Sequence, residues 1–332
     1  MRVILLLSVL LAACALANAK TPDQLRADFI DEMVSTHGFS KREVTRILYQ
    51  AQLRRPILEA IARPAEKRLN WSEYRNIFLT PSRILGGVDY WRTHAALLER
   101  AEREYGVPAQ IIVAILGVET RYGAHTGGYR VLDALHTLGF HYPPRGRFFR
   151  EQLSHFLRFA REEKISPTMP TGSYAGAMGV PQFMPDSFRV YAVDFDGDGH
   201  RDIWNNPADV IGSVANYFTK KGGWKPGQAV THPAHGVTAA HRALIDAGTK
   251  PSLDPARLTA AGIDIGTPPA PGGLLSLIEL ETTDGSEYWV GMDNFYAIMR
   301  YNPRAKYAMA VYQLSEAIRE QYLHTASTQG AG

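Results

Sequence analysis

One glutamate lies near the end of an apolar run, Ile111-Ile-Val-Ala-Ile-Leu-Gly-Val-Glu119-Thr-Arg-Tyr-Gly123. In a helix, Ile112 and Ile115 would share a face with Glu119, because they precede it by seven and four residues. We expect that face to point into the protein. Burial and the negative C-terminal end of the helix both disfavour a charged carboxylate, so the pKa of Glu119 should be raised.

An acid that stays protonated near neutral pH is suited to protonating the oxygen of a glycosidic bond. The alternative is a structural glutamate that pairs with Arg121 or with a buried hydroxyl, since structural pairs also perturb carboxylates. Most glycosidases use two carboxylates. Asp133, Glu151 and Asp186 are candidates for a second one, but the sequence alone does not fix their distances from Glu119.

A second group of chemically active side chains is the run Asp194-Phe-Asp196-Gly-Asp198-Gly199. Oxygen ligands at positions one, three and five, with glycine at six, reproduce the first half of an EF-hand calcium loop. Position twelve is Asn205 instead of glutamate, so Asp202 or Asp209 would have to close the site. We expect a structural calcium ion, and the alternative is a solvated acidic turn. The predicted ligands are Asp194, Asp196, Asp198, His200 and Asp209.

Aromatic residues near these motifs could stack against a sugar and bond to its hydroxyls, although each alone is more often a core residue. They are Tyr74, Tyr122, Tyr174, Phe183, Tyr217, Tyr301 and Tyr307. His136, His141 and His155 lack the spacing of metal ligands. The chain also lacks a Gly-x-Ser-x-Gly elbow, a phosphate-binding glycine loop and a His-Glu-x-x-His helix.

The elements that must position these residues are mostly helices. Pro108 and Gly123 predict the start and end of the Glu119 helix. Apolar residues three to four apart predict helices around 28–34 and 42–48, another over 89–100, and further helices over 130–162 (broken at 142–144), 209–220 and 307–322. Strand-like runs at 274–280 and 288–290 flank Thr283-Asp-Gly285, which indicates a β-hairpin.

Composition is that of an ordinary globular protein: 332 residues, 45% hydrophobic and 21% charged. The length suggests about two domains. The 36 basic and 33 acidic residues give a net charge of +3 without a dense basic run, which argues against nucleic acid as a partner.

The first residues form a targeting segment, because Arg2 precedes an apolar stretch, residues 3–13, that is too short to span a bilayer. Leu11-Ala-Ala-Cys14 fits a lipoprotein site in which Cys14 is acylated, whereas Ala17-Asn-Ala19 fits cleavage before Lys20. Either outcome predicts export to the periplasm, with or without a lipid anchor in the outer membrane. Cys14 is the chain's one cysteine, so it forms no disulfide within the chain.

Five motifs occur in an order that resembles one known family. They are Glu119-Thr-Arg-Tyr-Gly123, Gly172-Ser-Tyr-Ala-Gly-Ala-Met-Gly-Val-Pro-Gln-Phe-Met-Pro185, the loop at Asp194, Val214-Ala-Asn-Tyr-Phe218 and Asn294-Phe-Tyr-Ala-Ile-Met-Arg-Tyr-Asn302. Together they resemble the membrane-bound lytic murein transglycosylase B family of the lysozyme-like superfamily, over about residues 24–322.

The resemblance implies cleavage of the β-1,4 bond between N-acetylmuramic acid and N-acetylglucosamine in peptidoglycan, with Glu119 as the single catalytic residue. The product would be 1,6-anhydro-N-acetylmuramic acid. The sugar-contacting positions it implies are Tyr74, Ser173, Gln182, Phe183, Tyr217, Tyr301, Asn302 and Tyr307. Arg145 follows Pro144 where two adjacent arginines that contact the stem peptide are expected. A hydrolytic muramidase on the same fold, or a non-catalytic, calcium-stabilised peptidoglycan-binding protein, are the alternative functions.

The fold that the resemblance implies is α+β and mainly α: a lysozyme-like helical core, an N-terminal α domain and a small inserted β domain. We expect a signal segment at 1–19, an α domain at 20–100 completed by the helix at 293–325, the catalytic core with its calcium loop at 101–223, the β domain at 224–292, and a tail at 326–332. We further expect no catalytic cofactor, glycan strands of peptidoglycan as the partner, and a monomer that enzymes of cell-wall synthesis could recruit.

Overall fold

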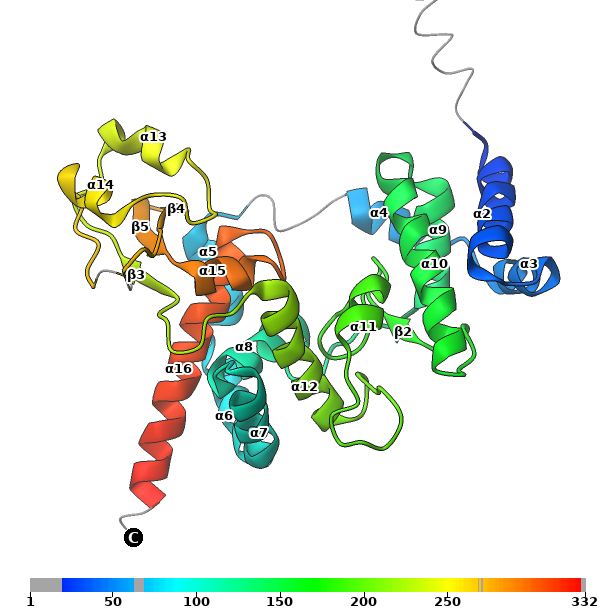
Figure 1. The fold of residues 1–332 in the computed structure, drawn as a ribbon, viewed down its shortest axis with the longest axis horizontal. Helices are drawn as coiled ribbons and strands as arrows, with labels where there is room; N and C mark the ends of the chain where they lie inside the picture. Colours follow the sequence, from blue (N-terminus) through cyan, green and yellow to red (C-terminus); the bar gives the residue numbers. More distant parts are fainter. Residues whose placement is uncertain (1–19, 63–68, 268, 270, 330–332) are drawn as a thin grey trace, which may run out of the picture. The chain divides into compact units, whose positions relative to one another are not determined.

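The computed structural model describes residues 20–62, 69–267, 269 and 271–329, which divide into two compact units (Figure 1). Unit 1 contains the described residues up to 62 together with 128–176, and unit 2 contains 69–127 together with the described residues from 177 onward. Each unit is therefore built from two separate segments of the chain. The fold class is confirmed, because both units are mainly helical and carry small antiparallel sheets.

Unit 1 is a group of helices with one two-residue strand pair. Its elements are α2 (Pro22–His37), α3 (Lys41–Gln50), α4 (Arg55–Ala62), β1 (Tyr129–Arg130), α9 (Val131–His141), the 3-10 helix η2 (Pro143–Arg145), α10 (Gly146–Glu162) and β2 (Thr171–Gly172). α9 packs against α10, and α2 contacts both. Local chemistry sets the limits of α2. Thr21 and Gln24 form a capping box at its start, and Gly38 ends it at a φ of 65°.

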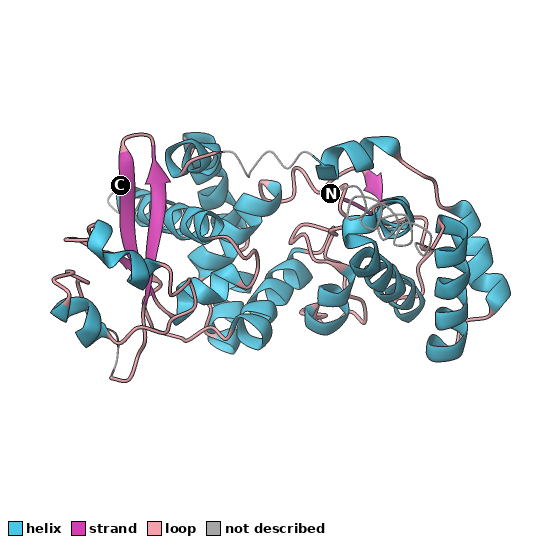
Figure 2. Ribbon diagram, turned by 90° about the horizontal axis from the view of Figure 1, so that it is seen from above, coloured by secondary structure: helices cyan, strands magenta, loops and turns pink. Residues whose placement is uncertain are grey.

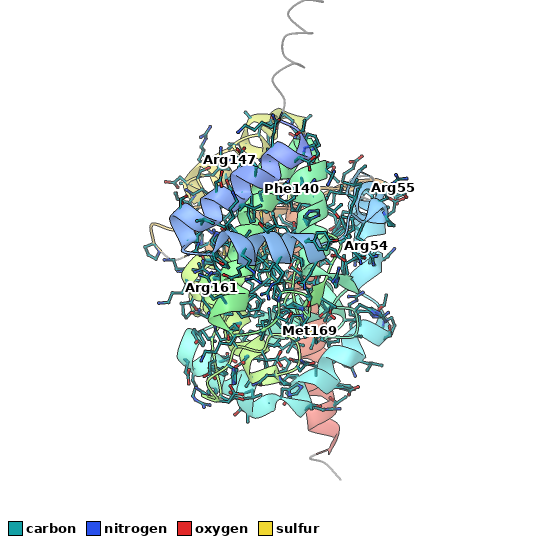
Figure 3. All side chains as sticks on the ribbon, turned by 90° about the vertical axis from the view of Figure 1, so that its right-hand side faces the viewer. Arg54, Arg55, Phe140, Arg147, Arg161 and Met169 are labelled. Atoms are coloured by element: carbon teal, nitrogen blue, oxygen red, sulfur yellow. The ribbon has the colours of Figure 1, made fainter. Side chains whose placement is uncertain are left out.

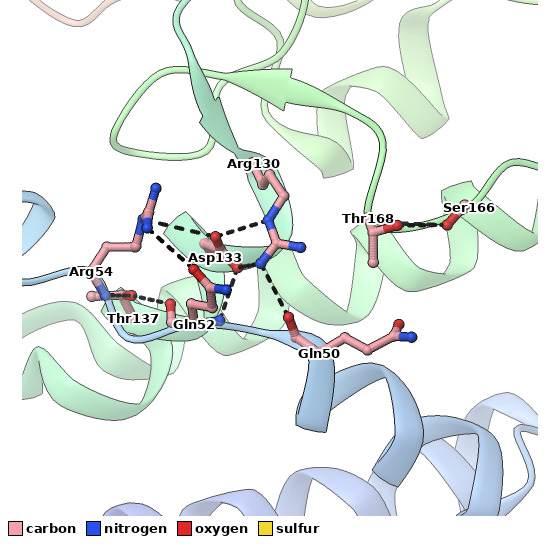
Figure 4. A network of polar contacts seen from close by, with 8 residues as sticks. All are labelled: Gln50, Gln52, Arg54, Arg130, Asp133, Thr137, Ser166 and Thr168. Carbon is pink, nitrogen blue, oxygen red and sulfur yellow. Dashed lines mark hydrogen bonds and ion pairs between the residues drawn. The ribbon is translucent and has the colours of Figure 1, made fainter.

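A buried carboxylate joins the two segments of unit 1 (Figure 4). Asp133 on α9 accepts hydrogen bonds from the backbone N–H of Gln52 at 2.9 Å and from the Arg130 guanidinium at 2.7 and 3.0 Å. The hydroxyl of Thr137 accepts the backbone N–H of Arg54 at 3.0 Å. Because these bonds fasten the link between α3 and α4 to α9, residues 20–62 belong with 128–176. The compact units therefore do not follow the α domain expected at 20–100.

The arginines labelled in Figure 3 lie on the surface of unit 1. Arg147 pairs with Glu151 at 2.9 Å, one helical turn away. Arg161 pairs with Glu43 at 3.3 Å, and its guanidinium carbon lies 3.2 Å from the centre of the Phe39 ring. Exposed pairs of this kind stabilise a fold by about 1 kcal/mol at most. The apolar packing between the helices, and not this surface, holds the unit together.

Unit 2 is organised around α8, the helix that carries Glu119. Its helices are α5 (Trp71–Phe78), α6 (Pro81–Thr93), α7 (Ala95–Tyr105), α8 (Ala109–Thr120), α11 (Pro185–Tyr191), α12 (Pro207–Tyr217), the π-helical turn η3 (Phe218–Gly222), α15 (Asp293–Met299) and α16 (Ala305–Gln329). α8 packs against α6, α7, α12 and α16. Residues 111–117 are buried, as the apolar sequence of this helix requires.

A small β-containing part of unit 2 has its own core. It comprises β3 (Thr231–Pro233), the 3-10 helix η4 (Ala239–His241), α13 (Arg242–Ile245), α14 (Pro255–Ala260), β4 (Ser276–Thr282) and β5 (Gly285–Gly291). The strands form an antiparallel sheet in the order β3-β5-β4, and the β4–β5 hairpin is plain in Figure 2. The register pairs Thr282 with Gly285, so the hairpin predicted from the Thr-Asp-Gly sequence is confirmed. Leu258, Leu275 and Val290 are fully buried in its core.

Three local predictions are wrong in detail. The single helix expected at 293–325 is two helices, α15 and α16, separated by residues 300–304. The helix expected over 89–100 is interrupted at His94, where the backbone leaves the helical region at a φ of −117° and ψ of 25° between α6 and α7. The Glu119 helix ends at Thr120 and not at Gly123, because Arg121 already adopts the left-handed conformation. Tertiary contacts of the following residues stabilise this earlier end.

The predictions at Cys14 and Ala19 concern residues outside those that the structure describes. Within the described part of the chain, no helix is both long and apolar enough to cross a membrane.

Candidate active site

Glu119 lies in the last turn of α8, in an apolar setting that the sequence pattern predicts. Ile112 and Ile115 on the same face are both fully buried, while Glu119 itself is only partly exposed. The hydroxyl of Tyr307, on α16, donates a hydrogen bond of 2.5 Å to Oε1 of Glu119. Glu119 therefore pairs with a hydroxyl group and not with Arg121, the other partner considered for a structural glutamate. Arg121 instead places its guanidinium 3.5 Å from the hydroxyl of Ser82.

Two opposing effects set the acidity of Glu119. Loss of solvation raises its pKa and the hydrogen bond from Tyr307 lowers it, and the net result is a rise from 4.5 to about 7. Desolvation is the larger effect. A substantial fraction of Glu119 is therefore protonated near neutral pH, as a general acid requires.

Four tyrosines lie close enough to this carboxyl for its charge to raise their pKa values. Burial raises the pKa of Tyr74 to about 12, and the Glu119 charge adds to that rise. The pKa values of Tyr217, Tyr301 and Tyr307 are also raised, first by burial and further by Glu119. Their hydroxyls thus stay protonated and able to donate hydrogen bonds. The structure brings together these four predicted residues, which span more than 200 positions of the sequence.

An aromatic cluster supports the loop next to α8. The ring of Tyr217 lies 4.8 Å from that of Tyr301 and 5.4 Å from that of Phe183, measured between ring centres. The Tyr301 hydroxyl donates to the carbonyl of Pro181 at 2.5 Å. Gln182 adopts a φ of 53° and donates to the carbonyl of Gly179 at 2.8 Å. These contacts fix the backbone of the loop that carries Gln182 and Phe183.

The remaining predicted substrate residues are Asn302, Ser173 and Arg145. Asn302 is half-buried in unit 2, just after Tyr301. Ser173 and Arg145 belong to unit 1. The Ser173 hydroxyl accepts the backbone N–H of Ala175 at 3.3 Å. Arg145 is exposed, with its guanidinium carbon 4.4 Å from the centre of the Phe148 ring. Their contacts with a substrate stay predictions.

The three candidates for a second catalytic carboxylate occupy different settings. Asp133 is buried and its oxygens are held in the unit 1 network, and Glu151 is in an exposed pair with Arg147. Asp186 lies in unit 2, where its Oδ1 accepts the backbone N–H of Ser187 at 2.6 Å. Glu119, by contrast, combines a raised pKa with a hydrogen bond from the Tyr307 hydroxyl.

The acidic loop gathers three carboxylates as a metal site would. Asp194, Asp196 and Asp209 each offer an oxygen, and these oxygens lie within 4.8 Å of one another. Asp209, on α12, is fully buried and accepts the backbone N–H groups of Phe195 and Asp202, both at 2.7 Å. Its pKa is raised by desolvation, and the neighbouring carboxylates Asp196 and Asp194 contribute. A hard cation would relieve that repulsion, so the residues present fit calcium.

The other two predicted ligands do not join this group of three. The carboxylate of Asp198 accepts the backbone N–H of His200 at 2.8 Å, and both residues are exposed. Of the two residues proposed to close the loop, Asp209 is in the group, whereas Asp202 accepts the backbone N–H groups of Trp204 and Asn205.

Sequence reasoning missed Arg83. This arginine on α6 is buried and donates to the carbonyl of Gly117, in the last turn of α8. Desolvation lowers its pKa, and the charge of Arg121 adds to this effect. The sequence did contain one signal of this close helix packing, the glycines Gly86, Gly87 and Gly117 inside helical patterns. Glycine at such positions usually allows another group to approach the helix closely.

A mainly helical fold with a desolvated acid on its central helix, hydrogen-bonded to one tyrosine and close to three others, is that of a lysozyme-like protein that acts on glycans. The chain belongs to the transglycosylase SLT domain family, whose model matches residues 21–316.

Relatives with names and solved structures support the same assignment. The chain is 43% identical over 302 residues to membrane-bound lytic murein transglycosylase B of Escherichia coli, covering 87% of this chain and 81% of that one. Soluble lytic transglycosylase SltB1 of Pseudomonas aeruginosa is 49% identical, with a TM-score of 0.83 over 89% of this chain and 98% of that one. Escherichia coli Slt35 in complex with calcium is 42% identical, with a TM-score of 0.80 over 90% and 94%. SltB3 of Pseudomonas aeruginosa in complex with NAG-NAM-pentapeptide is 30% identical, with a TM-score of 0.79 over 91% and 80%.

Proposed function

We propose that this chain is a lytic transglycosylase that cleaves the β-1,4 bond between N-acetylmuramic acid and N-acetylglucosamine in peptidoglycan. Glu119 is its acid and base, and the new end is a 1,6-anhydro-N-acetylmuramic residue. The observation that carries the proposal is the desolvated Glu119 with the Tyr307 hydroxyl as its hydrogen-bond partner. Family membership, and a relative whose solved complex holds NAG-NAM-pentapeptide, support peptidoglycan as the substrate.

In the first step Glu119 acts as the acid. Its proton passes to the bridging oxygen, the bond from that oxygen to C1 of the muramic residue breaks, and positive charge develops at C1. Because the Tyr307 hydroxyl occupies Oε1, the carboxyl proton is directed to the other oxygen. The raised pKa keeps this proton available near neutral pH.

In the second step the resulting carboxylate acts as the base. It takes the proton of the 6-hydroxyl of the same sugar as that oxygen bonds to C1, which restores the acid and adds no water. The Tyr307 hydrogen bond strengthens when Glu119 is ionised, so it stabilises the intermediate state. This mechanism needs only one carboxylate in two successive roles. Asp133 and Glu151 are therefore not required, and both are already paired within unit 1.

The other residues have supporting roles in this proposal. Tyr74, Ser173, Gln182, Phe183, Tyr217, Tyr301, Asn302 and Tyr307 contact the glycan, and Arg145 contacts the stem peptide. Asp194, Asp196 and Asp209 bind a structural calcium ion, since their oxygens lie within 4.8 Å of one another. The ion stabilises the loop before α12 and takes no part in the reaction. A relative solved with calcium supports this assignment.

The test is digestion of purified peptidoglycan in water enriched in heavy oxygen, followed by mass spectrometry of the products. A transglycosylase leaves unlabelled anhydro ends, about 18 mass units lighter than hydrolytic ends, because no water is added. Label at the cleaved C1 would identify a hydrolytic muramidase instead. Glu119→Gln should abolish cleavage and leave glycan binding within about threefold, because it preserves shape and the Tyr307 bond. Binding without cleavage by the unaltered protein would favour a non-catalytic binding protein.

The proposed site of action is the periplasm. The targeting segment supports export, and acylation at Cys14 would hold the enzyme at the outer membrane next to its substrate. The Escherichia coli relative is described as membrane-bound.

A further inference from the structure

The helix that carries Glu119 ends in an unusual backbone conformation. Arg121 and Tyr122 have φ values of 50° and 60°, and such consecutive left-handed conformations are costly for residues other than glycine. Their N–H groups donate to the carbonyls of Gly117 at 3.3 Å and Leu116 at 3.0 Å. Because this strained turn begins two residues after Glu119, contacts elsewhere must hold it in place.

The side chain of Tyr122 supplies these contacts by occupying a socket made of three glycines. A Cβ atom added at Gly117 would lie 2.6 Å from the Tyr122 hydroxyl, and one at Gly87 would lie 2.7 Å from it. A Cβ at Gly86 would approach the ring to 3.0 Å. The Tyr122 hydroxyl donates to the carbonyl of Arg83 at 2.7 Å. The tyrosine therefore fits only because these three positions lack side chains.

This glycine socket joins three helices that meet in unit 2 (Figure 1). Gly86 and Gly87 lie on α6, and Gly117 lies on α8. α16 also approaches closely, because a Cβ at Gly87 would be 2.5 Å from the side chain of Ile318. Arg83 forms a second contact between α6 and α8 by donating to the Gly117 carbonyl. Its positive charge is also favourable next to the negative C-terminal end of α8.

The same helices carry the two partners of the catalytic hydrogen bond, since Glu119 is on α8 and Tyr307 is on α16. We propose that Tyr122, seated in the glycine socket, is a positioning residue that holds the Glu119 carboxyl against Tyr307. Its hydroxyl and ring are engaged in this packing, so Tyr122 does not serve as a sugar contact. The inference rests on the proposed function of Glu119.

Four variants test the inference on soluble peptidoglycan fragments. Tyr122→Ala empties the socket, Tyr122→Phe removes only the hydroxyl, Gly117→Ala fills the socket, and the fourth variant combines Gly117→Ala with Tyr122→Ala. Gly222→Ala is the matched control, because a Cβ there meets its nearest neighbour at an ordinary 3.5 Å. Alanine favours helices over glycine, so helix propensity cannot explain a loss in Gly117→Ala.

We expect Tyr122→Ala and Gly117→Ala each to lower kcat by about 10- to 100-fold with KM within about threefold, as displacement of a catalytic group by about 1 Å does. Tyr122→Phe should keep most of the activity. The double variant should be no slower than Tyr122→Ala, because the added methyl group then has no ring to meet. Weaker contact with Tyr307 should also move the alkaline limb of the pH–rate profile upward. Loss of folded protein would instead move that limb downward, because stability falls as pH rises.

Wild-type kcat in Tyr122→Ala would overturn the inference, and so would losses that add in the double variant. If the folded fraction measured by thermal melting fully explained the kcat loss, the glycine socket would only stabilise the fold, and the inference would also be overturned. Glu119→Gln separates the two proposals. If that variant is inactive while Tyr122→Ala is fully active, only this inference fails, whereas an active Glu119→Gln would remove the proposed function itself.

Discussion

The raised pKa of Glu119 has a consequence for stability that can be measured without substrate. The folded protein holds the Glu119 proton up to a pH of about 7, while a carboxyl with the unperturbed value releases it at 4.5. Between these values the folded state binds more protons than the unfolded state, so stability falls as pH rises. Below 4.5 the carboxyl adds no penalty, and above about 7 the penalty is complete. Glu119→Gln removes the ionisable group and should therefore stabilise the protein at alkaline pH.

The size of the effect follows from the shift. A rise from 4.5 to about 7 is about 2.5 pH units, or about 3 to 4 kcal/mol at about 1.4 kcal/mol per unit. Because Glu119 is partly exposed, solvent reduces this figure, and we expect about 2 kcal/mol. That corresponds to a melting temperature about 4 to 8 °C higher at pH 8, with little difference at pH 4.5.

The assay is thermal melting of Glu119→Gln and the unaltered protein at several pH values from 4.5 to 8. Glutamine keeps an oxygen that accepts the Tyr307 hydrogen bond, so the packing is preserved. Glu320→Gln, which removes an exposed carboxylate from α16, controls for the loss of one charge. A difference between Glu119→Gln and the unaltered protein that stays constant with pH would refute the reasoning, because it would mean that folding does not raise the Glu119 pKa.

Four other predictions follow from the site and its surroundings. Tyr307→Phe should lower kcat and move the alkaline limb of the pH–rate profile upward, since it removes the bond that lowers the Glu119 pKa; an unmoved limb would contradict this. Calcium at about 100 times its Kd should raise the melting temperature by about 5 to 10 °C, as measured by calorimetry against chelator, and Asp196→Asn should remove that rise. Asp133→Ala should destabilise the protein by about 3 kcal/mol in denaturant unfolding while the cleavage products remain anhydro sugars, and a change to hydrolytic products would give Asp133 a catalytic role. Cys14→Ser should move the protein from the membrane to the soluble fraction, and mature protein beginning at Lys20 would show that Cys14 is not the anchor.

Local sequence chemistry was sufficient for several of the helices, for the β-hairpin and for the nature of the acid. The spacing of Ile112, Ile115 and Glu119 predicts an inward-facing carboxyl, because helical periodicity depends only on near neighbours. The hairpin around Thr283 and the acidic run from Asp194 are predictable for the same reason, since turn residues and ligand spacing are properties of short segments. Ordered motifs also sufficed for the family, because such a combination of short segments is specific.

Tertiary structure decided the contacts that tune these groups. Tyr307 is 188 residues from Glu119, and no local pattern marks it as the hydrogen-bond donor. Asp209 joins the acidic loop because α12 packs beside it, and Asp133 became structural because it binds the distant link between α3 and α4. The left-handed turn at Tyr122 could not be predicted from the sequence either. Its backbone cost is offset by packing against glycines on two helices, which exists only once the chain has folded.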